Sequence, residues 1–319
     1  MRAPNIFELF SPDQSVTFRP FDPCEQAAID TLVAAGDPRG ANRAANCAAD
    51  GVPAGFQDPL SARFSGVQSG NANLSEETAD TYTFGVVLQP RFADGLTISV
   101  DYWDIEIADA IAAVGGQDIV DNCYDTGGFP NGFCGLFTRN RDTTSPQFLG
   151  LNFIRQTQVN FGALESNGVD FSANYEFDAL GATWAGGLSG TWVDELNEFF
   201  DPGDPTAVDP ELGEIQRPEL AARLNLDFSY AGLFVRWQTT YQDEQALVSI
   251  EDIGTVYDGR AVEDEVIFHD LSLSYDFTEE LQVYGGIQNV TDEQPFFSEQ
   301  AWPVSPLGRY FFVGLSVQR

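Results

Sequence analysis

Very short and very long connections alternate along the last two thirds of the chain, and a strand-like segment with a two-residue period lies on each side of every connection. We expect about nine strands, at residues 81–90, 96–107, 165–177, 182–194, 217–230, 232–242, 266–277, 281–290 and 308–319. The short turns lie near Asp94, Leu180, 230–232 and 278–280, and the long connections span 108–164, 195–216, 243–265 and 291–307. This asymmetry between two rims is typical of an antiparallel transmembrane β-barrel with long outer loops.

Within the expected strands, apolar and polar residues alternate. Between Val169 and Phe177 every odd position is apolar and every even position is polar. A strand turns successive side chains to opposite faces, so one face should meet lipid and the other the lumen. We expect Phe171, Leu226, Trp237 and Leu273 to face lipid, and Asp170, Asp227, Arg236 and Asp276 to face the lumen. Between residues 96 and 107 the apolar set changes parity, which predicts a bulge near Tyr102 and Trp103 or a strand that rises into the outer loops.

Alternation alone would also fit a β-sandwich, which buries one face of each sheet. Sandwich strands usually have about 5–6 residues, whereas a strand that crosses a bilayer at a tilt needs roughly 9–11. The expected strands fall in the longer class, and Tyr and Trp residues lie toward their ends, as in the aromatic girdles of membrane barrels. The sequence therefore favours the all-β transmembrane barrel over a secreted sandwich.

The charge balance excludes some partners. The chain has 49 acidic and 15 basic residues, a formal net charge of −34, and every basic residue is arginine. Nucleic acid is not expected as a partner, because phosphate binding needs a basic surface. Much of the acidity lies in two long connections, at Asp201, Asp204, Asp209, Glu211 and Glu214 and at Glu251, Asp252, Asp258, Glu263, Asp264 and Glu265. These are interpreted as a solvated loop surface, with a Ca²⁺ site as the alternative, although no EF-hand spacing is present.

The four cysteines form two groups, Cys24 with Cys47 and Cys123 with Cys134, each inside a long connection. Four cysteines allow three pairings, and closeness in sequence favours Cys123–Cys134 and Cys24–Cys47. Disulfides would place these loops in an oxidising compartment. A zinc site is the alternative, but neither pair has short zinc-ligand spacing and the one histidine is distant in sequence.

That histidine limits the possible enzymology. His269 is in phase with Ile267 and Leu271, which places it on the apolar face near a strand end. A Ser-His-Asp arrangement would depend on this one outward-facing ring, and the sequence has neither a P-loop nor a GxSxG motif. We therefore expect no enzymatic activity, no cofactor and no resident metal.

The N-terminal third has no sustained period. Residues 24–36 are expected to form a short helix, with Asp22 as its cap and Pro23 at its first position. No basic segment followed by an apolar one comes after Met1, so a signal peptide is not apparent. Because an outer-membrane protein needs one, we expect the chain to be a fragment that lacks its N-terminal part.

Seven segments together resemble the barrel of TonB-dependent outer-membrane receptors. RAPNIFELF (Arg2 to Phe10) is similar to the family's R-A-P-x-x-x-E-L-F strand end, and NANLSEETADTYTFGV (Asn71 to Val86) to the strand start that follows it. The other segments are LTISVDYWDIEIADAI, FCGLFTR, ESNGVDFSANYEF, GIQNVTDEQP and PLGRYFFVGLSVQR, in the family's order. The resemblance covers essentially the whole chain.

The resemblance implies a 22-stranded barrel whose lumen holds an N-terminal plug. Residues 1–319 would be the C-terminal part of that barrel, with a strand end and long outer loop at 1–73 and the last nine strands at 74–319. The plug domain, the TonB box and about a dozen strands would lie outside the chain, and the nine strands alone should form an open sheet.

The implied function is import across the bacterial outer membrane of a scarce solute, such as a siderophore, cobalamin or an oligosaccharide. The implied partners are the TonB-ExbB-ExbD complex, the transported ligand, and outer-membrane lipid and lipopolysaccharide. No residue of the chain is assigned to the ligand. A passive porin and, less favoured, an outer-membrane enzyme are the alternatives.

Overall fold

A computed structural model describes the chain except for residues 61, 200–207, 251–252, 257–260, 298–300 and 318–319. Its described residues divide into two compact units. The first unit comprises Met1–Ala79 and Ile107–Leu164, together with Phe199 and Val208. The second comprises Asp80–Glu106, Glu165–Glu198 and the described part of Asp209–Arg319. The long strands β3, β4 and β6 pass from one unit into the other.

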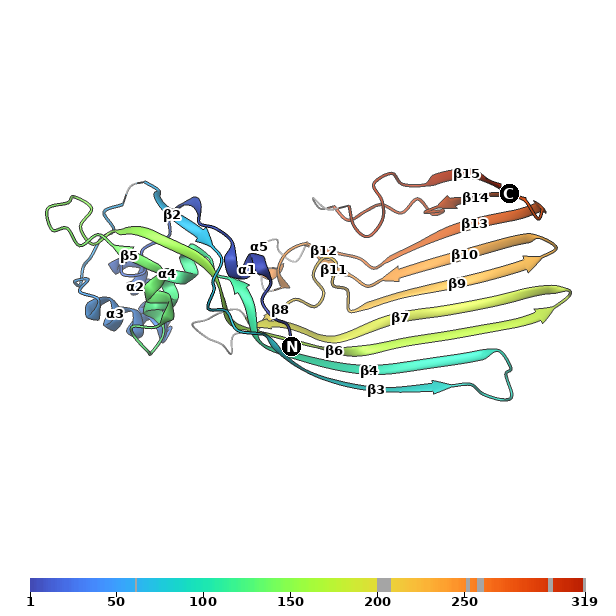
Figure 1. Ribbon diagram of the computed structural model, residues 1–319, viewed down its shortest axis with the longest axis horizontal. Helices are drawn as coiled ribbons and strands as arrows, with labels where there is room; N and C mark the ends of the chain where they lie inside the picture. The colour runs from blue at the N-terminus through green and yellow to red at the C-terminus, as the bar shows by residue number, and fades with distance from the viewer. Residues whose placement is uncertain (61, 200–207, 251–252, 257–260, 298–300, 318–319) are drawn as a thin grey trace. The chain divides into compact units, whose positions relative to one another are not determined.

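All nine expected strands are present. They are β3 (Thr78–Leu88), β4 (Leu96–Ala113), β6 (Leu151–Ala179), β7 (Ala182–Phe199), β9 (Leu220–Tyr230), β10 (Leu233–Gln242), β13 (Val266–Thr278), β14 (Leu281–Gln288) and β15 (Tyr310–Val317). They hydrogen-bond to one another in this order. In the part of the chain that the structure describes, β3 pairs only with β4 and β15 only with β14 (Figure 1). The sheet is therefore open, as expected for a portion of a barrel.

Two tight turns show why the hairpins form where the sequence places them. Leu180 and Gly181 join β6 to β7 with φ angles of 57° and 79°, and Ala231 and Gly232 join β9 to β10 with φ angles of 47° and 81°. Two consecutive residues with positive φ give a turn whose twist matches that of the flanking strands. Glycine at the second position of each turn adopts this backbone without strain.

The register separates an apolar face from a polar face. Trp237 of β10 lies opposite Leu226 of β9 and Leu271 of β13, so the three share one face. Arg236 lies opposite Asp227 and donates to both of its carboxylate oxygens, at 2.7 and 2.6 Å, on the other face. The division into two faces expected from the alternation is confirmed.

The first unit contains most of the helices. They are α1 (Ile6–Phe10), α2 (Gln26–Ala35), α3 (Arg39–Ala49), α4 (Gly116–Asp125) and the 3-10 helix η1 (Gly132–Leu136). The short strands β2 (Phe64–Ser69) and β5 (Phe137–Arg139) pair with the first part of β6, and β1 (Gln14–Phe18) pairs with β2. Ile119, Val120, Tyr124, Leu151 and Ile154 form the centre of an apolar core. The N-terminal segment 1–73 and the connection 108–164 thus fold into one packed body, which is called the loop body below.

Shorter elements lie in the remaining connections of the second unit. They are β8 (Asp209–Pro210), β11 (Gln245–Ala246), the helix α5 (Ile253–Val256) and β12 (Val262–Glu263). Strands β11 and β12 pair with each other in a small separate sheet. None of the helices in the described residues is long and apolar enough to cross a membrane.

Three strands are markedly longer than the sequence predicts. Strand β4 continues to Ala113 rather than ending near residue 107, β6 begins at Leu151 rather than at 165, and β7 continues to Phe199 rather than ending at 194. The added part of β6 pairs antiparallel with β5 and parallel with β2. These partners lie in segments without a visible period, so the extension could not be inferred from β6 alone. Strand β4 also has a positive φ of 55° at Asp109. The change of face expected near Tyr102 and Trp103, by a bulge or by a rise of the strand into the outer loops, stays a prediction.

The N-terminal expectations need two corrections. Helix α2 begins at Gln26 with Glu25 at its N-cap, so Asp22 is not the cap and Pro23 is not the first helical residue. The segment from Arg2 to Phe10 is not the strand end that the resemblance implies, because Ile6–Phe10 form the helix α1, which Asn5 caps with a capping box. Only the isolated bridge between Arg2 and Glu77 keeps strand-like pairing there.

Candidate ligand-binding site

Both expected disulfides are present in the first unit. Cys24 and Cys47 are joined with 5.6 Å between their Cα atoms, which ties the start of α2 to α3. Cys123 and Cys134 are joined with 4.9 Å between their Cα atoms, which ties α4 to η1. No cysteine is free, so the zinc alternative is wrong. The cross-links fix the helices of the loop body to one another.

A buried ion pair links β5 to the segment before α2. Arg139 donates from Nη1 to Asp22 Oδ2 at 2.5 Å and from Nη2 to Asp22 Oδ1 at 2.7 Å. Arg139 Nε donates to the Tyr124 hydroxyl at 2.8 Å, and that hydroxyl donates to Asp50 Oδ2 at 2.8 Å. Burial raises the pKa of the Tyr124 phenol above its usual range. The network holds four separate segments together.

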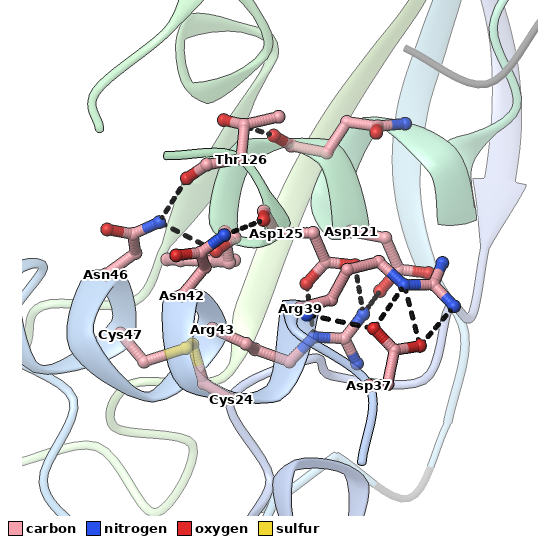
Figure 2. A network of polar contacts seen from close by, with 12 residues as sticks. Cys24, Asp37, Arg39, Asn42, Arg43, Asn46, Cys47, Asp121, Asp125 and Thr126 are labelled. Atoms are coloured by element: carbon pink, nitrogen blue, oxygen red, sulfur yellow. Dashed lines mark hydrogen bonds and ion pairs between the residues drawn. A yellow bond between two sulfur atoms is a disulfide. The ribbon is translucent and has the colours of Figure 1, made fainter. Parts of the chain in front are cut away.

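A second network joins α3 to α4, as Figure 2 shows. Arg43 donates to both carboxylate oxygens of Asp125, each at 2.5 Å, and to Asp121 Oδ1 at 3.1 Å. Asn46 Nδ2 donates to the carbonyl oxygens of Tyr124, in the last turn of α4, and of Thr126, its C-cap residue. These groups satisfy carbonyls at the helix C-terminus that have no partner within the helix. Burial raises the pKa of Asp121, and the Arg43 charge opposes that shift.

A small polar pocket of about 160 Å³ lies in the first unit, beside the sheet of β1, β2 and β6. Its lining includes four glutamines, Gln14, Gln68, Gln156 and Gln158, with Phe7 and Ser11. Gln14 lies opposite Gln68, and Gln68 lies opposite Gln156, so three side-chain amides form a row across three strands. The Oε1 atom of Gln158 is buried and has no hydrogen-bond partner. The pocket offers hydrogen-bonding groups that the protein itself does not use.

A broader depression of about 470 Å³ lies on the polar face of the second unit. Residues of that face which line it are Asp170, Ser189, Thr191, Arg223, Thr240 and Gln242. Thr191 donates to Asp170 at 2.6 Å. The depression extends over several strands and is open, so it is suited to contact with another protein segment more than to enclosure of a small ligand.

His269 sits in β13 opposite Thr239, and its Nδ1 lies 2.9 Å from the Thr239 hydroxyl. Its ring packs against Trp237 with 5.1 Å between the ring centroids. Within the described residues no group of His, Cys, Asp or Glu could hold a metal ion. Several acidic residues of the Ca²⁺ alternative, namely Asp201, Asp204, Glu251, Asp252 and Asp258, lie outside the described residues.

The structure thus brings together the cysteine pairs that the sequence indicates and adds two features that the sequence analysis missed. The Arg–Asp networks join residues 78 to 117 positions apart, and no local pattern marks such pairs. The glutamine row has one local signal in the sequence, the Gln-Thr-Gln triplet at 156–158. The triplet indicates that β6 has a polar face, but it does not indicate which strands pair with β6 there.

One protein-family model matches most of the chain. The family model described as "TonB dependent receptor-like, beta-barrel" matches residues 1–290. A comparison with curated proteins found no match.

Solved structures give the same fold. A variant of the ferric enterobactin receptor from Pseudomonas aeruginosa matches 99% of this chain and 36% of its own length, with 14% identity and a TM-score of 0.54. The siderophore receptor PirA from Acinetobacter baumannii matches 82% of this chain and 34% of its own, with 16% identity and a TM-score of 0.50. The chain spans about a third of these proteins' length.

Proposed function

This chain belongs to the TonB-dependent receptor β-barrel family, and we propose that it supplies wall strands and outer loops of a receptor that imports a scarce solute across the bacterial outer membrane. The observation that carries this proposal is the combination of nine long strands, which belong to one sheet with two chemically distinct faces, and the folded loop body. The apolar face would contact lipid and lipopolysaccharide, and the polar face would line the lumen.

The proposed transport depends on energy because of the barrel's width. A barrel of the family's size encloses a lumen that must be plugged to prevent leakage. We propose that a plug domain and a TonB box outside these residues close the lumen and couple it to the TonB-ExbB-ExbD complex. The open depression around Asp170 and Arg223 is a suitable contact for such a plug, because both charges and several hydroxyls project from one face.

The charges of the loop body favour a neutral solute over an anionic one. Six of the eight arginines of the first unit have acidic partners within 4 Å; they are Arg2, Arg39, Arg43, Arg139, Arg141 and Arg155. Arg19 and Arg63 are exposed and have no such partner among the described residues. Capture of an anion needs unpaired cationic groups, and the ion pairs leave only these two in the described part of the first unit. The similar structures are siderophore receptors, but they share at most 16% identity with this chain and indicate the fold alone. An oligosaccharide therefore fits the loop body better than a ferric siderophore, with cobalamin as a further candidate.

Uptake measurements test the proposal. The complete receptor gene would be expressed in a Gram-negative host, and accumulation of labelled ferric enterobactin, cyanocobalamin and maltotriose would be measured with and without a functional TonB protein. We expect one probe to accumulate only when TonB is present. Equal entry of all three probes without TonB would indicate a passive porin, and chemical conversion of a probe at the cell surface would indicate an enzyme. Either result would contradict energised import.

A further inference from the structure

The geometry points to the pocket formed by Gln14, Gln68, Gln156 and Gln158 as a subsite for one ring of a neutral oligosaccharide. This inference rests on the proposed function, because it assigns a place and a chemical class to the solute that the outer loops capture. The glutamines lie on one face of the β1–β2–β6 sheet, since residues that are directly opposite in paired strands share a face, and Gln158 follows Gln156 by two positions.

The first argument is that the amides are available. No hydrogen bond joins any of the four side-chain amides to another residue in the described part of the chain, although neighbouring Gln residues in a row can bond to one another. Gln14 and Gln68 are exposed, as ordinary solvated glutamines would be. Gln158 is different, because its Oε1 is enclosed and unpaired. A buried polar atom without a partner carries a free-energy cost that a ligand hydroxyl would remove.

The second argument is the chemistry of the lining. A carboxamide presents one acceptor and two donors, and a sugar hydroxyl is both a donor and an acceptor. A row of amides therefore matches a ring that carries hydroxyls on neighbouring carbons. No charged side chain lines the pocket. Arg155 pairs with Asp13 at 2.7 Å and donates to the hydroxyl of the lining residue Ser69 at 3.0 Å. Strand alternation places Arg155 on the face opposite to Gln156.

The third argument is the size and the rim. A volume of about 160 Å³ is below the usual range of roughly 300–1,000 Å³ for pockets that enclose a drug-sized ligand. It suits one unit of a longer molecule whose remainder extends into solvent. Phe7 lines the pocket while remaining 69% exposed, so its ring face is free to cover the apolar side of a pyranose.

The test uses the receptor expressed from its complete gene, purified in detergent, with a panel of neutral trisaccharides built from glucose, galactose, mannose or xylose. Binding would be measured by calorimetry and ligand-observed NMR. We expect at least one trisaccharide to bind, and we expect Gln158→Leu to weaken its binding about tenfold or more, because the hydrogen bond to the buried amide is lost. The same substitution should raise the melting temperature of the ligand-free protein, because it removes an unpaired buried polar atom.

Two further variants keep the test decisive. Gln68→Leu changes an exposed member of the row, so it should fold even if Gln158→Leu does not, and it should also weaken binding. Gln57→Leu is the matched control, because Gln57 is an exposed glutamine of the same unit outside the pocket. Unchanged trisaccharide binding in both pocket variants would overturn the inference, as would the absence of binding by every trisaccharide. TonB-dependent uptake of another probe would then leave the proposed function intact.

Discussion

Arg139 and Asp22 form a doubly hydrogen-bonded ion pair in which the side chains are 1% and 0% exposed, although 117 residues separate them in the sequence. The guanidinium also donates to the Tyr124 hydroxyl and to the Leu149 carbonyl, so its donors face partners inside the core. Removing one member of such a pair leaves an uncompensated charge in a dry site. The stability of the loop body should therefore be sensitive to replacement of either residue of the pair.

We expect Arg139→Met to destabilise the loop body by about 3–5 kcal/mol, because Asp22 would remain buried without its partner. Hydrogen–deuterium exchange of the peptides around residues 119–125 would report this loss locally, without requiring the sheet to unfold. Arg141→Met is the matched control. Arg141 pairs with Asp50 while its side chain is 49% exposed, and exposed pairs contribute roughly 0–1 kcal/mol. Equal protection of these peptides from exchange in the two variants would show that the buried pair stabilises the loop body no more than the exposed pair does.

The disulfides give a second prediction. Cys24→Ser with Cys47→Ser, or Cys123→Ser with Cys134→Ser, should each destabilise the loop body by about 3 kcal/mol in the chain-entropy relation, slightly more for the longer loop. The bridges span 23 and 11 residues. Peptide mapping of the non-reduced protein should recover the pairs 24–47 and 123–134 alone. A mixed pairing, or free thiols in the native protein, would contradict this arrangement.

The pH dependence of stability should change when Asp121 is replaced. Burial raises the pKa of Asp121, so the fold favours its protonated form. The stability that this group contributes is present at pH values below its unfolded pKa of about 3.9 and is lost as the pH rises through the raised folded pKa. We therefore expect Asp121→Asn to stabilise the loop body at pH 7 and to have little effect at pH 3. The free energy of unfolding of the wild-type and variant proteins would be measured at both pH values. A larger stabilisation by Asp121→Asn at pH 3 than at pH 7 would contradict the prediction.

The regular part of the fold could be predicted because its signals are local. The alternation from Val169 to Phe177 and the turn at Leu180–Gly181 are properties of neighbouring residues, and both are present as expected. The start of α2 was mispredicted because Asp22, a good cap by type, is used by Arg139 from a distant strand. The glutamine row depends on the parallel pairing of β2 with β6. Pairs so far apart in sequence have no period that a single chain could reveal.

The two faces of the sheet should tolerate charge differently. Leu226 lies on the apolar face opposite Trp237, and its neighbour Asn225 lies on the polar face opposite Gln238. If the apolar face contacts lipid, Leu226→Arg should cost about 2–4 kcal/mol near the bilayer midplane, whereas Asn225→Arg should be tolerated. Urea unfolding of the complete receptor in liposomes would compare the two variants. A greater cost for Asn225→Arg would reverse the assignment of the faces.

The open edges of the sheet lead to the last prediction. Within the described residues, β3 and β15 each have one neighbouring strand, so each leaves a row of backbone N–H and C=O groups without partners. Lipid cannot satisfy such groups, and exposed edges promote association between chains. The polar face, with Asp170, Asp227 and Arg236, is also unsuited to collapse into a dry core. We therefore expect residues 1–319 expressed alone to aggregate in detergent, while the complete gene product gives a heat-modifiable monomer on gels. A compact heat-modifiable monomer with a stable single-channel conductance, formed by residues 1–319 alone, would show that these strands close without further strands.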